Sequence, residues 1–217
     1  MPSPIIAPAI LSETPTAFKA LVTRYFPFTK RAHIDLSDAS LTPVKTIAPA
    51  SVWWPRGWTT DIHLISRFPS QYLDTIIKLK PHLLIVHAEA EENLLDLFAK
   101  LKSAGIKAGV AIIKNVFPDN IKPIILAADY ALIFSGELGY YGGKADLLLL
   151  EKVPLIRRIK PEIEIGWDGG VNLNCARPIA QAKVDVLNVG SAISNATNPA
   201  EVFAKLSQEI EQEEPLL

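Results

Sequence analysis

The sequence predicts a single (β/α)8 TIM barrel over residues 1–217, on three observations. Short apolar segments alternate with longer amphipathic segments along the whole chain, which is the pattern of strands and helices in an α/β barrel. The short segments are rich in Val, Ile and Leu and are apolar on both faces, as in a parallel sheet that is covered on both sides. The connections are short, and no linker or change in composition marks a domain boundary.

Eight segments have the length and composition of such strands. The alternative is an open doubly wound sheet, which usually has a Gly-rich phosphate loop after its first strand, and "APAILSETP" is not such a loop. The expected strands span residues 5–11, 32–37, 60–66, 82–88, 107–113, 129–135, 162–167 and 185–190.

About seven helices are expected between the strands. Pro15 suits an early helical position, and Gly105 suits a helix stop. Pro154 should kink or break the helix expected over residues 145–160. Segment 42–58 holds three prolines and a glycine, so we expect only a short or distorted helix there. The remaining helical patterns span residues 14–26, 69–80, 91–105, 173–183 and 198–212.

Composition excludes several classes of protein. A net charge of -1 without a long basic run argues against binding to nucleic acid or to anionic membranes. No apolar stretch approaches the roughly 20 residues of a membrane helix, and prolines interrupt the apolar N-terminal segment, which is typical of a strand rather than a signal peptide. Cys175 is the only cysteine, so no internal disulfide can form, which fits a cytoplasmic location.

Polar residues occur at the carboxyl ends of several strands, where barrel enzymes carry their active sites. His33 and Asp35 are two residues apart and therefore face the same side of their strand. His63 lies in the next strand, and Asp168 follows the seventh. Two imidazoles and two carboxylates at one barrel mouth predict a site for one divalent metal ion, with Zn²⁺, Fe²⁺, Mn²⁺ or Co²⁺ favoured over Mg²⁺ or Ca²⁺. A His-x-Asp pair by itself is more often a structural or surface feature.

Other polar residues near these ends have less definite roles. We expect His87 and Glu89 to support the site or the fold, and His82 to be structural at the opposite rim. Asp61 lies deeper on the same face as His63, where it either orients a ligand or is an interior carboxylate satisfied by water. Cys175 is expected to be an inert core residue.

Glycines mark a second candidate site beside the first. They lie in the loops after the sixth, seventh and eighth strands, and loops after the last two strands commonly bind phosphate in these barrels. Glycine lets backbone N–H groups approach an anion closely. The alternative is that each glycine only permits a tight turn. The predicted substrate- and phosphate-binding residues are Gly139, Gly142, Gly143, Gly169, Gly170, Gly190 and Ser191.

Taken in order, these segments resemble the ribulose-phosphate 3-epimerase family over nearly the whole chain. The matching segments are "IIAPAILS", "HIDLSD", "DIHLI", "IVHAEA", "KAGVAI", "GYYGGK", "WDGGVN" and "VDVLNVGSAI".

The resemblance implies a phosphate-binding TIM barrel that interconverts D-ribulose 5-phosphate and D-xylulose 5-phosphate. It implies that His33, Asp35, His63 and Asp168 hold one divalent metal ion, which binds the C2 and C3 oxygens of the substrate. It further implies that Asp35 and Asp168 flank C3, so that one removes its proton and the other delivers a proton to the opposite face. A sugar phosphate is then the small-molecule partner, and a homo-oligomer is expected.

The chain also departs from the family in the walls and the loop around the sugar. Ser37 replaces a methionine, Ala39 and Ser40 replace Gly-His, and Ile65 replaces a second methionine. Ala9 stands where the family has a substrate-contacting serine, and Lys144 stands where it has a glutamine. These changes leave two alternatives open: an epimerase of a related ketose phosphate such as allulose 6-phosphate, and a non-catalytic barrel that binds phosphosugars.

The segment "WWPRGW", residues 53–58, is the remaining conspicuous feature. Trp and Arg are enriched in protein interfaces, which allows a subunit contact. We favour an interpretation in which the rings cover the outer barrel wall in place of missing helix. By strand alternation, Trp167 is expected to pack outward against the helices, opposite Asp168.

Overall fold

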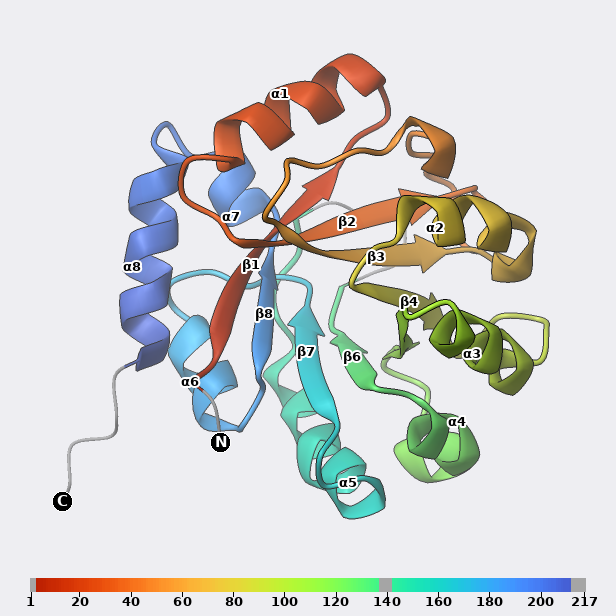
Figure 1. The fold of residues 1–217 in the computed structure, drawn as a ribbon. Coiled ribbons are helices and arrows are strands. Elements are labelled where there is room, and N and C mark those ends of the chain that lie inside the picture. Colours follow the sequence, from red (N-terminus) through yellow and green to blue (C-terminus); the bar gives the residue numbers. More distant parts are fainter. Residues whose placement is uncertain (1–2, 137–141, 212–217) are drawn as a thin grey trace, which may run out of the picture.

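The structure, a computed structural model, describes residues 3–136 and 142–211. Eight parallel strands pair in chain order, and β8 pairs with β1, so that the sheet closes into a barrel with helices around it (Figure 1). The predicted TIM barrel is confirmed, and the open doubly wound sheet is excluded. That residues 1–217 form one domain stays a prediction.

The strands lie where the sequence pattern placed them, with small differences at their ends. Val, Ile and Leu occur on both faces of these segments because both faces of a parallel barrel strand are buried. The strands are β1 (Ile5–Leu11), β2 (Arg31–Ser37), β3 (Thr59–Ile65), β4 (Leu83–His87), β5 (Lys107–Ile112), β6 (Tyr130–Phe134), β7 (Glu164–Asp168) and β8 (Val186–Val189).

Eight α-helices and four short 3-10 helices connect the strands in the described ranges. The α-helices are α1 (Pro15–Tyr25), α2 (Leu73–Leu79), α3 (Leu94–Ser103), α4 (Lys122–Ala127), α5 (Lys152–Ile159), α6 (Ala176–Gln181), α7 (Ser191–Ser194) and α8 (Pro199–Glu211). The 3-10 helices are η1 (Pro49–Ser51), η2 (Pro69–Tyr72), η3 (Pro118–Ile121) and η4 (Leu147–Glu151).

Helices α4 and α7 were not among the helices expected from the sequence. Helix α4 was not predicted, because Pro118 and Pro123 interrupt its short apolar pattern. Both prolines lie in first turns, of η3 and of α4, where a missing N–H costs nothing. The expected break at Pro154 takes the form of η4 followed by α5, with Pro154 in the first turn of the α-helix.

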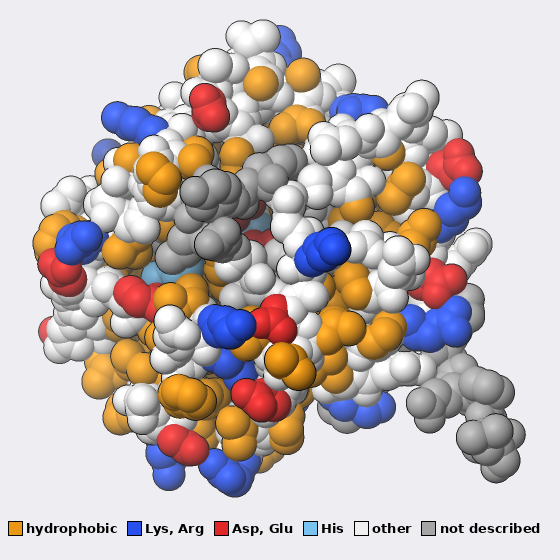
Figure 2. Space-filling view, turned by 180° about the vertical axis from the view of Figure 1, so that it is seen from behind, with side chains coloured by type: hydrophobic (Ala, Val, Ile, Leu, Met, Phe, Trp, Pro, Cys, Tyr) orange, Lys and Arg blue, Asp and Glu red, His pale blue; other side chains and the backbone are white. Residues whose placement is uncertain are grey.

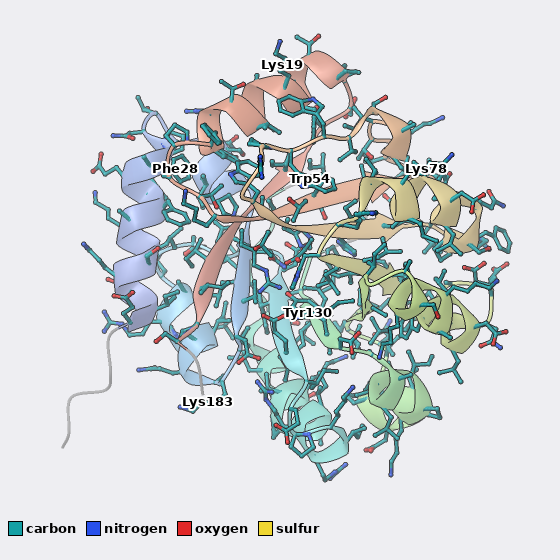
Figure 3. The ribbon with its side chains drawn as sticks, in the orientation of Figure 1. Lys19, Phe28, Trp54, Lys78, Tyr130 and Lys183 are labelled. Carbon is teal, nitrogen blue, oxygen red and sulfur yellow. The ribbon has the colours of Figure 1, made fainter. Side chains whose placement is uncertain are left out.

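After β2 the chain forms only η1 before β3, as the prolines of segment 42–58 indicate. Trp54 and Trp58 pack against the apolar layer outside the barrel, and Trp53 lies edge-on to Phe18 at 6.2 Å between ring centroids. Figure 3 labels Trp54 near α1 and the neighbouring strands. The aromatic side chains thus cover a stretch of wall that has no α-helix.

Strand alternation divides the interior into two apolar clusters. The larger cluster lies between the barrel and the helices, and it includes Trp167, as expected, together with Leu187 and Val189. The smaller cluster fills the barrel itself and includes Tyr130 and Val186. Side chains that alternate with the larger cluster along each strand therefore point into the barrel.

A partly buried ion-pair network lies at the amino-terminal end of the strands. Arg31 Nε is 2.6 Å from Asp61 Oδ2, and Arg31 Nη1 is 2.6 Å from Glu164 Oε1. Asp61 is fully buried, and burial raises its pKa despite the neighbouring Arg31 charge. Arg31 is therefore one partner of the Asp61 carboxylate, whereas Asp61 Oδ1 has no hydrogen-bond partner among the described residues. The expectation that Asp61 orients a ligand or is satisfied by water stays a prediction.

We predict that Arg31→Met lowers the free energy of unfolding by about 3–5 kcal/mol, because it leaves the Asp61 carboxylate buried without a countercharge. Urea unfolding of the variant and the wild type measures this difference. The double variant Arg31→Met with Asp61→Leu should recover part of the loss, since both charges are then absent. Equal stability of the single variant and the wild type would contradict the prediction.

Candidate active site

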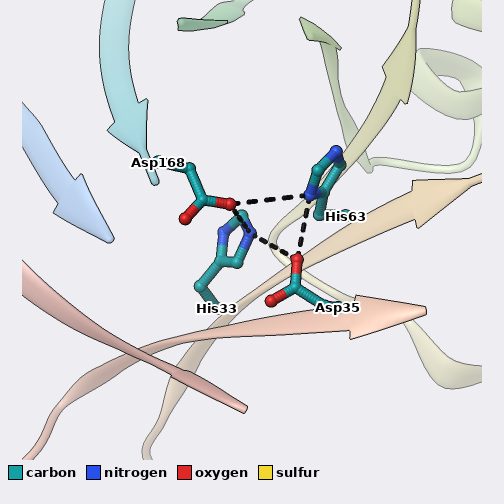
Figure 4. Close-up of side chains that lie close together, drawn as sticks. All are labelled: His33, Asp35, His63 and Asp168. Carbon is teal, nitrogen blue, oxygen red and sulfur yellow. Dashed lines mark hydrogen bonds and ion pairs between the residues drawn. The ribbon is translucent and has the colours of Figure 1, made fainter. Parts of the chain in front are cut away.

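The carboxyl ends of three strands bring four ionisable side chains together at the barrel mouth. Asp35 on β2 pairs in register with His63 on β3, His33 lies one inward position earlier on β2, and Asp168 ends β7 (Figure 4). All four side chains are buried, and one ligand atom from each lies within 4.8 Å of the others. The structure thus confirms that these four residues converge.

The distances fit a single cation with mixed nitrogen and oxygen ligands. Asp35 Oδ1 is 3.2 Å from His33 Nε2 and 2.9 Å from His63 Nδ1. Asp168 Oδ2 is 3.6 Å and 3.8 Å from the same two nitrogens. Ligands about 2.1 Å from one ion lie roughly 3–4 Å from each other. The cluster can therefore hold a divalent ion with small side-chain movements.

Neighbouring charges and hydrogen bonds shift the pKa values of the two buried carboxyl groups in opposite directions. Burial and the nearby Asp35 charge raise the pKa of Asp168 to about 7. Burial also acts to raise the pKa of Asp35, but the His33 charge and the hydrogen bonds with His33 and His63 outweigh it and lower that pKa below its usual range. Near neutral pH, one carboxyl group is thus ionised while the other exchanges a proton.

The pKa values of His33 and His63 are also shifted in opposite directions. Burial acts to lower the pKa of His33, but the charges of Asp35 and Asp168 raise it to about 9. Burial lowers the pKa of His63, for which Asp35 compensates only in part. The two rings therefore differ in their tendency to carry a proton, although both contact Asp35.

Behind His63, His87 and Glu89 form a short hydrogen-bonded chain. The Nε2 atoms of His63 and His87 are 2.9 Å apart, and His87 Nδ1 is 3.3 Å from Glu89 Oε2. If His63 Nδ1 is free to bind a cation, its Nε2–H donates to His87, whose Nδ1–H donates to Glu89. The Phe134 ring packs against both imidazoles, with centroids 5.8 Å from each. This geometry agrees with a supporting role for His87 and Glu89.

A pocket of about 160 Å³ opens beside the four-residue cluster. On the face shown in Figure 2, histidine side chains are visible in a hollow near the middle of the surface, beside acidic side chains. Asp35 and Asp168 line one part of the pocket, and the glycine loops line another. Gly139 lies outside the described residues. The other predicted phosphate residues all line this pocket: Gly142, Gly143, Gly169, Gly170, Gly190 and Ser191.

Two of these glycines are required by both backbone conformation and space. Gly169 and Gly170 have φ of +106° and +73°, a region that side-chain-bearing residues rarely adopt. A Cβ on Gly169 would lie 2.2 Å from Gly136 N, and one on Gly170 would lie 2.1 Å from Ala145 N. The glycines therefore do more than permit a turn, because they let the loops after β6 and β7 touch at the pocket.

The wall after β2 is rich in hydroxyl groups. Ser37, Thr42 and Thr46 line the pocket, and Thr46 Oγ1 accepts a hydrogen bond from Ser37 N at 2.8 Å. Ala39 has φ of 69°, a left-handed conformation that costs an alanine about 1 kcal/mol or more. The departures from the family at Ser37 and Ala39 thus lie in the pocket wall and in the loop that follows it.

Sequence reasoning did not single out Glu13, Thr42, Phe134 or Asn188, which also line the pocket. Asn188 had a recognisable signal, because it is a polar residue inside an otherwise apolar strand, two positions before Gly190. Strand alternation from that position predicts an inward side chain. Thr42 and Glu13 lie in loops, whose approach to the mouth no periodicity indicates.

Fold and site together define the class of protein. A closed parallel barrel with ionisable side chains and glycine loops at the carboxyl ends of its strands has the architecture of a TIM-barrel enzyme. Solved structures with this fold include 3-hexulose-6-phosphate synthase from Salmonella typhimurium, with a TM-score of 0.68 and 15% identity over 95% of this chain and 98% of that one. Tryptophan synthase from M. tuberculosis has a TM-score of 0.71 and 12% identity over 97% and 94%. At these identities the likeness shows the fold alone.

Sequence comparison identifies the family. Residues 5–194 match the ribulose-phosphate 3 epimerase family, so this chain belongs to that family of isomerases. It is 28% identical to ribulose-phosphate 3-epimerase of Schizosaccharomyces pombe, over 82% of this chain and 81% of that protein. The enzyme of the same name from Bacillus subtilis is 29% identical over 80% and 84%, and that from Helicobacter pylori strain J99 is 30% identical over 74% and 77%.

The described helices include none with the length and apolar character that crossing a membrane requires.

We predict that affinity for a divalent cation rises with pH between about pH 6 and pH 8. Ligation needs Asp168 and His33 without their protons, and pKa values of about 7 and about 9 mean that both groups release protons as the pH rises. Titration with Co²⁺, followed by its visible absorption, should show an apparent dissociation constant that falls at least ~10-fold over this range. The variant His82→Gln, outside the cluster, should behave like the wild type; a constant or falling affinity would contradict the prediction.

We also predict that Gly170→Ala weakens binding of inorganic phosphate by roughly 10-fold or more, because its Cβ must displace the adjoining loop and small misplacements in a site are costly. Gly105→Ala is the matched control: Gly105 has φ of +76°, but nothing lies within 4 Å of its added Cβ. Both variants should lose stability, and only the first should lose phosphate affinity by calorimetry. Equal phosphate affinity in the two variants would show that Gly170 serves the turn alone.

Proposed function

We propose that this chain is a metal-dependent epimerase that interconverts D-ribulose 5-phosphate and D-xylulose 5-phosphate. The observation that carries the proposal is the pair Asp35 and Asp168, which approach one pocket from separate strands and whose pKa values are shifted in opposite directions. Inversion at a carbon next to a ketone needs one proton acceptor and one proton donor on opposite faces. Membership of the ribulose-phosphate 3-epimerase family supports the same reaction and substrates.

In this proposal, His33, Asp35, His63 and Asp168 hold one divalent cation from the set Zn²⁺, Fe²⁺, Mn²⁺ and Co²⁺. Such an ion would stabilise negative charge that develops on the ketone oxygen when the neighbouring proton is removed. This help is needed because a carboxylate with a pKa near ~4 is a weak base for such a proton.

The proposed proton transfers use the two aspartates in turn. The ionised Asp35 accepts the C3 proton from one face, which leaves an enediolate, and Asp168 delivers a proton to C3 from the other face. In the reverse direction the roles exchange. The loops that carry Gly142, Gly170 and Ser191 hold the phosphate at the other end of the pocket.

A second candidate is epimerisation of a ketohexose 6-phosphate such as allulose 6-phosphate. The hydroxyl-rich wall of Ser37, Thr42 and Thr46 favours it, because an extra hydroxymethylene group would find hydrogen-bonding partners there. A cytoplasmic location and a homo-oligomer stay predictions. Turnover of D-ribulose 5-phosphate against allulose 6-phosphate separates the two substrates, and absence of turnover with both would favour a non-catalytic barrel.

We predict that Asp35→Asn and Asp168→Asn each lower kcat for D-ribulose 5-phosphate by at least ~100-fold, the usual scale for a positioned acid or base. The wild type should incorporate solvent deuterium at C3 during turnover, measured by NMR. Asp38→Asn is the control: Asp38 binds Ser40, Ser66 and Tyr72 outside the cluster, so its loss should lower stability and leave most of kcat. Near-normal kcat in either cluster variant, or product without deuterium, would contradict the assigned roles.

A further inference from the structure

Asn188 presents a buried amide to the pocket. Its neighbours Leu187 and Val189 belong to the apolar layer outside the barrel, so the alternating Asn188 points inward. The residue is only 1% exposed, and it lines the pocket. Among the described residues, neither its Nδ2 nor its Oδ1 has a hydrogen-bond partner. An amide buried in this way is costly unless a ligand or water completes its hydrogen bonds.

Asn188 lies between the four-residue cluster and the loop that begins at Gly190. Asn188 pairs in register with Asp168 across β7 and β8, and it precedes Gly190 by two residues. Neighbouring strands lie about 4.8 Å apart, so the amide is next to the carboxylate cluster on one side. On the other side it adjoins the loop that begins at Gly190. A ligand that joins the cluster to the glycine loops must pass over Asn188.

The surroundings leave the amide open toward the pocket. On the other neighbouring strand, β1, Ala7 pairs with Asn188, and Ala9 lines the pocket above it. These small side chains leave space over the amide. The Tyr130 hydroxyl inside the barrel interacts with Asn188, but neither side chain meets the distance and angle of a hydrogen bond among the described residues. An amide offers two N–H donors and an acceptor oxygen, so groups remain for a ligand even if Tyr130 takes one.

We infer that the Asn188 amide is a specificity-determining group that hydrogen-bonds the sugar hydroxyl between C3 and the phosphate-bearing carbon, which is the C4 hydroxyl of a pentulose 5-phosphate. The inference rests on the proposed function, in which C2 and C3 lie at the four-residue cluster and the phosphate lies at the glycine loops. C4 is then the carbon over Asn188. A neutral amide suits a hydroxyl group, since it can both donate to it and accept from it.

The test compares D-ribulose 5-phosphate with its 4-deoxy analogue, 1,3-dihydroxypentan-2-one 5-phosphate. Exchange of the C3 proton in D₂O, followed by NMR, gives kcat/KM for both compounds. The wild type should prefer the parent compound by at least ~10-fold, because a site built to bind a hydroxyl group rejects a ligand without it. Asn188→Leu, of similar size but apolar, should accept the two compounds nearly equally.

Tyr130→Phe is the matched control. It removes the hydroxyl beneath the amide and should keep the wild-type preference, whereas a structural pairing of Asn188 with Tyr130 would make both variants alike. Asn188→Ala provides a second variant if the leucine disturbs folding, which thermal unfolding and Co²⁺ binding would reveal. Inorganic phosphate should bind the wild type and Asn188→Leu equally.

The outcomes separate this inference from the proposed function. An unchanged preference in Asn188→Leu, the same loss in Tyr130→Phe, or weaker binding of inorganic phosphate to Asn188→Leu would each overturn the role of Asn188. If the wild type exchanges no proton, the proposed function fails. Calorimetric binding of the two compounds to the wild type and Asn188→Leu then tests the amide directly, and equal binding of both compounds to the wild type overturns it.

Discussion

Closure of the parallel barrel is the constraint on which the site depends. Parallel pairing sends the carboxyl ends of all eight strands to one mouth, and the register of β2 with β3 sets Asp35 beside His63. Asp168, more than a hundred residues later, arrives at the same point because β7 is another wall of the same barrel. A one-residue slip in any of these strands would turn the side chain into the apolar layer outside the barrel.

The electrostatics of the mouth follow from that convergence. Two carboxylates in a buried site cannot both ionise freely, so burial and mutual repulsion raise the pKa of Asp168 while the histidines stabilise ionised Asp35. The two buried carboxylates and two imidazoles also offer ligands to a divalent cation, which would replace protons by ligand bonds. The proposed acid–base chemistry and the proposed metal binding would thus both depend on this convergence of side chains.

The rest of the barrel interior supports the mouth in two ways. At the amino-terminal end, Arg31 joins Asp61 and Glu164 and closes the base with paired charges. Between base and mouth, Tyr130 fills the space that Gly166 leaves, since a Cβ on that glycine would lie 1.8 Å from the hydroxyl oxygen. Asn188 lies above this filled layer, and so the floor of the pocket is polar although the barrel beneath it is packed.

The sequence by itself determined the eight strands, the order of the barrel and the four residues of the cluster. These predictions rest on local periodicity. A His or Asp in a strand points to the face that strand alternation assigns to it, whichever strands lie beside it. The tertiary structure alone decided the partner of Asp61, the contact between the loops at Gly170 and Ala145, and the unpaired state of the Asn188 amide. Helix α4 was also seen only in the tertiary structure, because its prolines interrupt the helical pattern of the sequence and Ile125 is its single buried residue. The physical reason is that periodicity encodes which face is buried, whereas contacts between segments distant in sequence arise only when the barrel closes.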